Sequence, residues 1–178
     1  MGNKVISNTP DPRSSDGVSL LISILVRFPQ IGTVQFDSKN RLLTLNFMLS
    51  QTVPPDDLEV FKKTIAANLQ AYHYIVNKEP SSVIIKIQQP YDKFCVLSIV
   101  RDIATLSKGE ITLLSTLLTE KFQECLILDG SEYIPDFIDD IDFSDELIDT
   151  MFEVVRAQRA AKNLTALREN GRVLVFSK

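Results

Sequence analysis

The stretch from Phe94 to Phe122 constrains the fold more than any other part of this 178-residue chain. Residues 94–100 read FCVLSIV, so apolar side chains occupy both faces of an extended segment until Arg101 and Asp102. Apolar residues on both faces are typical of a central strand that is covered on both sides. The β-branched and aromatic content favours a strand over a buried helix.

An amphipathic helix is predicted directly after this strand. Lys108-Gly109 breaks the apolar pattern, and apolar side chains then recur at spacings of three and four residues. Such spacing places them in one stripe along a helix, which we expect to pack on the sheet. The stripe consists of Ile111, Leu114, Leu118 and Phe122.

The first half of the chain repeats this order of elements. A hairpin is predicted from 32–36 and 41–49, with a polar turn between them, and a helix begins at Pro54-Pro55. A further strand over 82–88 precedes the central strand, so each half reads hairpin then helix. Neither hairpin could bury its apolar face alone. The sequence therefore predicts an α+β fold with a mainly antiparallel sheet built from two hairpin-helix (ββα) units.

Two features of this arrangement stay open. Ser19–Gln30 fits a helix with one polar stripe, which we favour, but a strand is the competing interpretation. Two helices would also cover only one face of the sheet. We expect the other face to be covered by the element at 20–28, by the C-terminal helix or by a second subunit.

The C-terminal third is expected to pack on the same domain. A short strand is predicted over 125–128, followed by an acidic loop and a helix capped by Ser144. Asn170-Gly171 predicts a turn before a final strand over 172–176, which would pair with its own sheet or with that of a neighbouring molecule. We expect 1–17 to be a disordered tail, 18–130 the core domain and 131–178 the acidic loop, helix and terminal strand.

Composition narrows the class of protein. A net charge of −4 argues against a protein dedicated to coating nucleic acid. No apolar run approaches the length needed to cross a bilayer. We therefore expect a cytoplasmic protein without membrane contact.

Basic residues near the end of the chain form one candidate binding surface. Arg156, Arg159 and Lys162 would share one face of the C-terminal helix, and Arg168 and Arg172 would flank the last turn. Such a face can contact phosphates of nucleic acid or a nucleotide. The alternatives are a solvated helix end and a surface for an acidic protein.

The acidic loop gives a second candidate. Asp139, Asp140 and Asp142 offer oxygen ligands for a divalent cation, as a carboxylate-metal enzyme requires, although the ligand spacing of an EF-hand loop is missing. A solvated acidic loop or a surface for a basic partner would produce the same pattern.

The remaining polar residues are predicted to be structural. His73 is the single histidine, Arg101 and Asp102 are expected to form a local ion pair, and Cys95 and Cys125 lie in apolar runs. No catalytic residue, cofactor or family resemblance emerges. We expect a binding or oligomerisation module, most simply a homodimer, rather than an enzyme.

Overall fold

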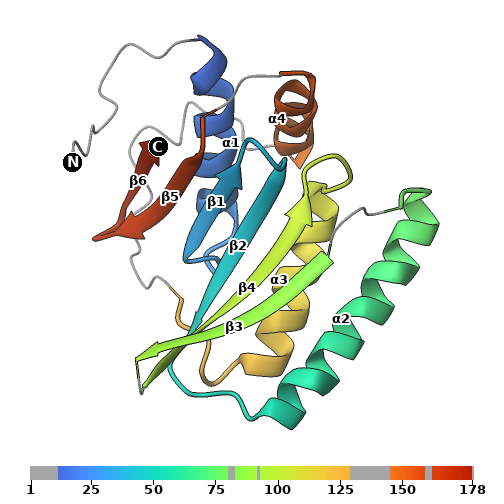
Figure 1. The fold of residues 1–178 in the computed structure, drawn as a ribbon, viewed down its shortest axis with the longest axis vertical. Helices are drawn as coiled ribbons and strands as arrows, with labels where there is room; N and C mark the ends of the chain where they lie inside the picture. Colours follow the sequence, from blue (N-terminus) through green and yellow to red (C-terminus); the bar gives the residue numbers. More distant parts are fainter. Residues whose placement is uncertain (1–11, 80–82, 92, 129–144, 159–161, 178) are drawn as a thin grey trace.

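The computed structural model describes residues 12–79, 83–91, 93–128, 145–158 and 162–177. In this part of the chain, four helices and a six-stranded antiparallel sheet confirm the predicted α+β fold (Figure 1). The helices are α1 (Pro12–Arg27), α2 (Pro55–Val76), α3 (Lys108–Phe122) and α4 (Asp145–Ala157). The strands are β1 (Thr33–Asp37), β2 (Leu42–Leu49), β3 (Val83–Tyr91), β4 (Phe94–Asp102), β5 (Leu164–Glu169) and β6 (Arg172–Ser177).

The two predicted ββα units lie side by side in the sheet. The strand order is β3-β4-β2-β1-β5-β6, so the hairpins β1-β2 and β3-β4 meet along β2 and β4. Leu45 lies opposite Ile99 in this antiparallel pair, and the helix-facing side chains of both strands are buried. The core therefore forms where the two hairpins join, as the sequence pattern predicted.

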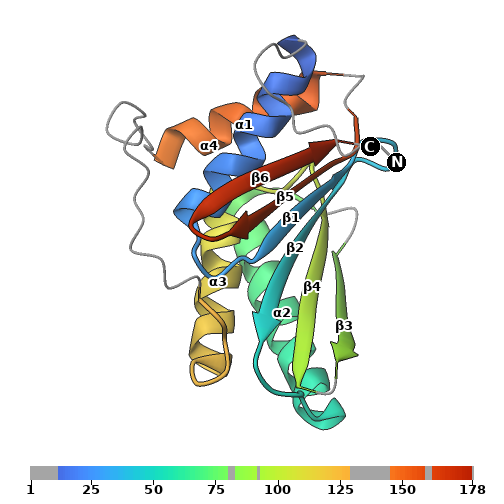
Figure 2. The same ribbon diagram turned by 90° about the vertical axis from the view of Figure 1, so that its left-hand side faces the viewer.

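All four helices lie on one face of the sheet. α2 packs against α3, while α1 packs against α4 and over β1, β5 and β6 (Figure 2). The first and last helices thus extend the helix layer and do not cover the second face. The sequence predicted that the second face is covered by the element at 20–28, by the C-terminal helix or by a second subunit. The first two of these expectations are wrong.

The second face carries a polar row in place of a second apolar layer. Ser98 Oγ donates a hydrogen bond to Asn46 Oδ1 at 2.6 Å, and Asn46 Nδ2 donates to Thr33 Oγ1 at 2.7 Å. These three side chains link β4, β2 and β1 across the sheet. A hydrogen-bonded row of this kind satisfies polar groups that would otherwise need water.

The first element is a helix, as favoured over a strand. Leu20, Leu21, Ile24 and Leu25 are buried on its sheet-facing side. α1 starts at Pro12, so residues 12–17 of the predicted tail are helical. Residues 1–11 lie outside the described part of the chain.

Several predicted boundaries differ from the structure. Lys108 and Gly109 form the first turn of α3, because the side chain of Ser107 caps this helix and accepts a hydrogen bond from Glu110 N. Residues 125–128 make only an isolated bridge, between Leu49 and Leu126, where a short strand was predicted.

The C-terminal segment forms a hairpin on the chain's own sheet. β5, which the sequence did not indicate, pairs with β1 and with β6. Asn170 and Gly171 connect β5 and β6 with positive φ angles of 51° and 74°. Two left-handed residues suit the tight turn of a hairpin, which is why Asn-Gly occurs here.

Candidate functional site

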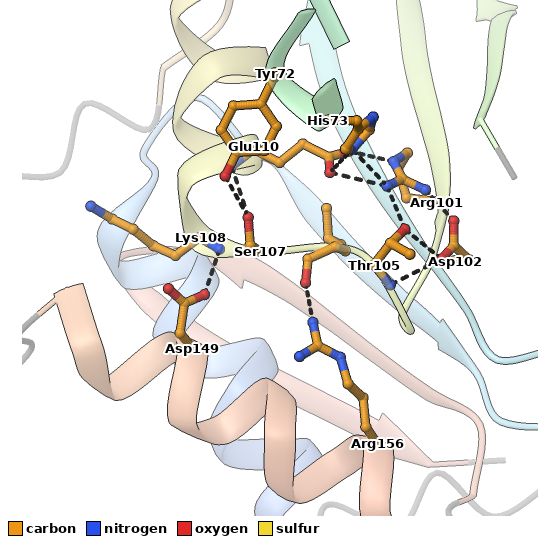
Figure 3. Close-up of polar contacts among 11 residues, drawn as sticks. Tyr72, His73, Arg101, Asp102, Thr105, Ser107, Lys108, Glu110, Asp149 and Arg156 are labelled. Carbon is orange, nitrogen blue, oxygen red and sulfur yellow. Dashed lines mark hydrogen bonds and ion pairs between the residues drawn. The ribbon is translucent and has the colours of Figure 1, made fainter. Parts of the chain in front are cut away.

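The structure places Arg156 in an internal role. Its Nε donates to the carbonyl of Ile103 at 2.8 Å, and a second guanidinium nitrogen donates to the carbonyl of Leu106. Figure 3 shows the side chain of Arg156 pointing from α4 toward the loop before α3. The guanidinium also lies 5.5 Å from the centre of the Phe152 ring. Arg156 therefore ties α4 to the loop between β4 and α3.

Lys162, a second predicted basic residue, lies outside α4. α4 ends at Ala157, where Arg41 donates to the carbonyls of Val155, Arg156 and Gln158. Lys162 is exposed beyond the end of the helix, and Arg159 lies outside the described residues. Lys162 therefore does not share a helical face with Arg156.

The two arginines of the C-terminal hairpin differ in their surroundings. Arg168 donates to the carbonyls of Phe28 at 3.0 Å and Pro29 at 3.1 Å, and also to that of Leu25, so it caps the end of α1. Arg172 is exposed in β6.

The predicted metal ligands are not among the described residues. Asp139, Asp140 and Asp142 belong to the stretch 129–144, so the metal site remains a prediction. Within the described part of the chain, no group of three or more histidine, cysteine, aspartate or glutamate side chains could hold a metal ion.

The most unusual feature of the described structure is a charged network buried in the helix layer. Arg101 follows Cys95, Leu97 and Ile99 along the helix-facing row of β4, and its side chain is fully buried. The guanidinium binds Glu110 through two nitrogens, one of them 3.0 Å from Oε2, and also contacts Asp102. This geometry confirms the predicted pairing of Arg101 with Asp102 and adds Glu110, which the sequence did not single out.

Two further side chains complete the network. His73, on the last turns of α2, places Nε2 2.8 Å from Glu110 Oε2. Thr105 donates from its hydroxyl and its amide to Asp102 Oδ2, at 2.6 and 3.0 Å. The network thus joins α2, β4 and α3 at one buried point (Figure 3).

The electrostatics of Arg101 favour its charged form. Burial by itself would lower the pKa of Arg101, but the hydrogen bonds and charges of Glu110 and then Asp102 outweigh burial and raise the pKa above its ordinary value. A guanidinium held by two hydrogen bonds is a fixed partner for Glu110.

A close approach of α2 to α3 fixes the position of His73. The hydroxyl of the preceding residue, Tyr72, lies 2.8 Å from Ser107 Oγ. A Cβ added at Gly109 would lie only 2.6 Å from that hydroxyl. Gly109 therefore allows Tyr72 to reach Ser107 across the first turn of α3.

A groove of about 1340 Å³ opens beside this network, between α2 and β3. Leu69 and Ala66 line it on the helix, Val83 and Ile85 line it on the strand, and His73 contributes to its floor. Lys62, Gln70 and Lys78 also border it. It is larger than the hollow of about 260 Å³ beside Val60 and Phe61, and it contacts the network through His73.

Neither cysteine has the lowered pKa of an activated nucleophile. Burial raises the pKa of the thiols of Cys95 and Cys125, so both stay protonated near neutral pH. Cys95 Sγ donates to the carbonyl of Gln51 at 3.0 Å. The groove combines apolar walls with a polar floor, and that combination suits binding.

Comparisons with protein-family models, with curated proteins and with solved structures found no match. No helix of the described residues has the length and apolar character needed to cross a membrane.

The sequence contains a signal for the buried histidine. Phe61, Ile65, Leu69 and His73 recur at a spacing of four residues, so His73 continues the buried stripe of α2. A polar residue on such a stripe is expected to have a buried partner. The identity of the partner, Glu110, depends on the packing of α2 against α3 and has no local signal.

Proposed function

We propose that the protein is a non-enzymatic binding module that associates with a second copy of itself along the outer edge of β3. Self-association through one repeated surface would produce a homodimer with two-fold symmetry. The observation that carries this proposal is the concentration of exposed apolar side chains next to that edge.

This apolar patch spans the end of α2 and the start of β3. Tyr74 and Ile75 are 88% and 80% exposed, and Ile84 is 41% exposed. Side chains of this size are normally distributed singly over a monomer surface, whereas a cluster marks an interaction site. We refer to Tyr74, Ile75, Val76, Val83 and Ile84 as the β3-edge patch.

The backbone of β3 supports the same proposal. β3 pairs with β4 on one side and with no described strand on the other, so its outer edge offers hydrogen-bonding groups to another strand. Lys86 is the single charged residue between Val83 and Gln88. An antiparallel pairing centred on Ile85 would place Lys86 opposite Ile84 of the second copy, which avoids two like charges.

A cytoplasmic location fits this proposal. Cys95 and Cys125 are both free thiols, which suits a reducing compartment. An exposed apolar patch is stabilised when a partner covers it. A second copy of the chain is always present where the protein is made, so it can be that partner.

Light scattering coupled to size-exclusion chromatography tests the proposal. The unmodified protein is expected to elute as a dimer at micromolar concentration. Ile84→Lys is expected to shift it toward monomer, because the substitution places two lysines close to the two-fold axis.

Val60→Lys is the matched control. Val60 is an exposed apolar residue on α2 outside the β3-edge patch, and it borders a different hollow with Phe61 and Leu117. The control is expected to remain a dimer. A monomeric unmodified protein, or equal dissociation of both variants, would contradict the proposal.

A further inference from the structure

His73 carries an unpaired acceptor at the floor of the groove between α2 and β3. The side chain is only 4% exposed, and its Nδ1 has no hydrogen-bond partner among the described residues. Buried polar atoms are nearly always paired, so an unpaired one beside a groove indicates a position for a ligand atom. His73 itself lines that groove.

The contacts of Glu110 determine which hydrogen-bonding group His73 presents. Arg101 donates to both oxygens of the Glu110 carboxyl, which fixes this group as a carboxylate that can only accept hydrogen bonds. His73 Nε2 lies 2.8 Å from Oε2 of that carboxylate, so Nε2 carries the proton and donates it. In this tautomer Nδ1 is the acceptor.

The walls of the groove define the rest of the ligand. Ala66 and Leu69 from α2 face Val83 and Ile85 from β3 across the groove. These side chains can bury an apolar body but cannot pair a polar one. The volume of about 1340 Å³ accommodates a small organic molecule.

We propose that the groove binds a small amphipathic molecule, of the phenol or alcohol class, whose hydroxyl donates a hydrogen bond to His73 Nδ1. The apolar part of the molecule lies between Leu69 and Ile85. The groove shares Tyr74, Ile75, Val83 and Ile84 with the β3-edge patch, so both proposals draw on the same end of α2 and β3. Their readouts keep them apart, because light scattering reports self-association, whereas the Ala66 and Ala67 variants lie outside the patch and report phenol binding.

Three probes that share a para-propylphenyl body and differ in their polar group test the hydrogen-bond assignment. Binding of para-propylphenol, para-propylanisole and para-propylbenzoate is measured by amide NMR shifts of the full chain at millimolar probe concentration. The phenol is expected to shift the amides of Leu69, Val83 and Ile85. The anisole lacks the donor and is expected to bind about tenfold more weakly, because it leaves Nδ1 unpaired.

A pair of tryptophan substitutions locates the site without disturbing the network. Ala66 lines the groove and is exposed, so Ala66→Trp is expected to fill the groove and abolish phenol binding. Ala67 is also exposed but does not line the groove, so Ala67→Trp is expected to bind the phenol like the unmodified protein. Equal phenol binding by the two variants would overturn the location.

The tautomer of His73 provides a readout that is independent of affinity. Long-range proton–nitrogen correlation spectra are expected to show a protonated Nε2 and an unprotonated Nδ1, with the Nδ1 signal moving when the phenol binds. A protonated Nδ1, equal affinity for phenol and anisole, or tighter binding of the benzoate would each overturn the donor assignment. The absence of any phenol-induced shift at the groove would overturn the site.

Discussion

His73 Nε2 lies 2.8 Å from Glu110 Oε2, and this contact joins the end of α2 to the first turn of α3. The same carboxylate receives Arg101 from β4, so three elements of the fold meet at one buried ion pair. Charged groups are rarely buried without a partner, because removing them from water is costly. The position of α2, and with it the shape of the groove, therefore depends on this network.

Arg101→Met is expected to destabilise the protein strongly. The substitution keeps an unbranched apolar stem at this position but leaves the carboxylates of Glu110 and Asp102 buried without their cation. Breaking a buried ion pair in this way costs about 3–5 kcal/mol in the free energy of unfolding. Urea unfolding followed by circular dichroism measures this change.

The double substitution Arg101→Met with Glu110→Leu is the matched control. Removing both partners eliminates the uncompensated charge on Glu110, so the double variant is expected to be less destabilised than the sum of the two single variants. A loss smaller than about 1 kcal/mol for Arg101→Met alone would show that the pair does not hold the helix layer together.

Gly109→Ala is expected to lower stability, although alanine is the better helix former. In α3 alone the substitution would stabilise by about 0.5–1 kcal/mol. The added Cβ would lie 2.6 Å from the Tyr72 hydroxyl, however, so Tyr72 must move and lose its hydrogen bond to Ser107. Thermal unfolding measures the net change.

Tyr72→Phe reverses the expected sign for Gly109→Ala. Without the hydroxyl the clash is relieved, so Gly109→Ala in the Tyr72→Phe background is expected to raise the melting temperature. Melting temperatures that change equally in both backgrounds would rule out the close approach as the reason for Gly109.

Most of the fold could be predicted because the apolar pattern is local. The alternation in β2 and β4 and the three- and four-residue spacing in α3 each follow from the direction of the side chains along one element. β5 was missed because Leu164, Thr165 and Ala166 alternate apolar and polar side chains over only three residues, which is too short to predict a strand. Its assignment to the sheet comes from pairing with β1, more than a hundred residues earlier in the chain.

The site was harder to predict because its residues meet only through tertiary packing. His73 and Glu110 lie 37 positions apart. His73 continues the buried stripe of α2, but no local pattern identifies Glu110 as its partner. The contacts of the arginines also depend on tertiary packing. Arg156 and Arg168 look like members of a basic surface, yet the structure uses their guanidinium groups to satisfy carbonyls at the end of a strand and of a helix.

Arg168→Met is expected to destabilise the protein more than Arg172→Met. The guanidinium of Arg168 binds the carbonyl of Leu25 in the last turn of α1 and the carbonyls of Phe28 and Pro29 just after it. Hydrogen bonds from a charged group contribute about 1.5–3 kcal/mol. Arg172 is exposed, and its substitution is expected to change the free energy of unfolding by less than about 0.5 kcal/mol. Equal losses for both variants in urea unfolding would contradict the capping role of Arg168.

Both cysteines are expected to react slowly with Ellman's reagent in the folded protein. Burial raises the pKa of each thiol above its ordinary value of 9.0, so at any given pH the reactive thiolate is rarer than in the unfolded chain. The reaction rate of the native protein is therefore expected to keep rising as the pH increases through 9.0.

Cys95 is fully buried and Cys125 is half-buried, so Cys125→Ser should remove the faster phase and leave the slower one. Urea-unfolded protein is the control, in which both thiols should react at the same rate. Rapid labelling of Cys95 in the native state near neutral pH would mean that the start of β4 is open to solvent.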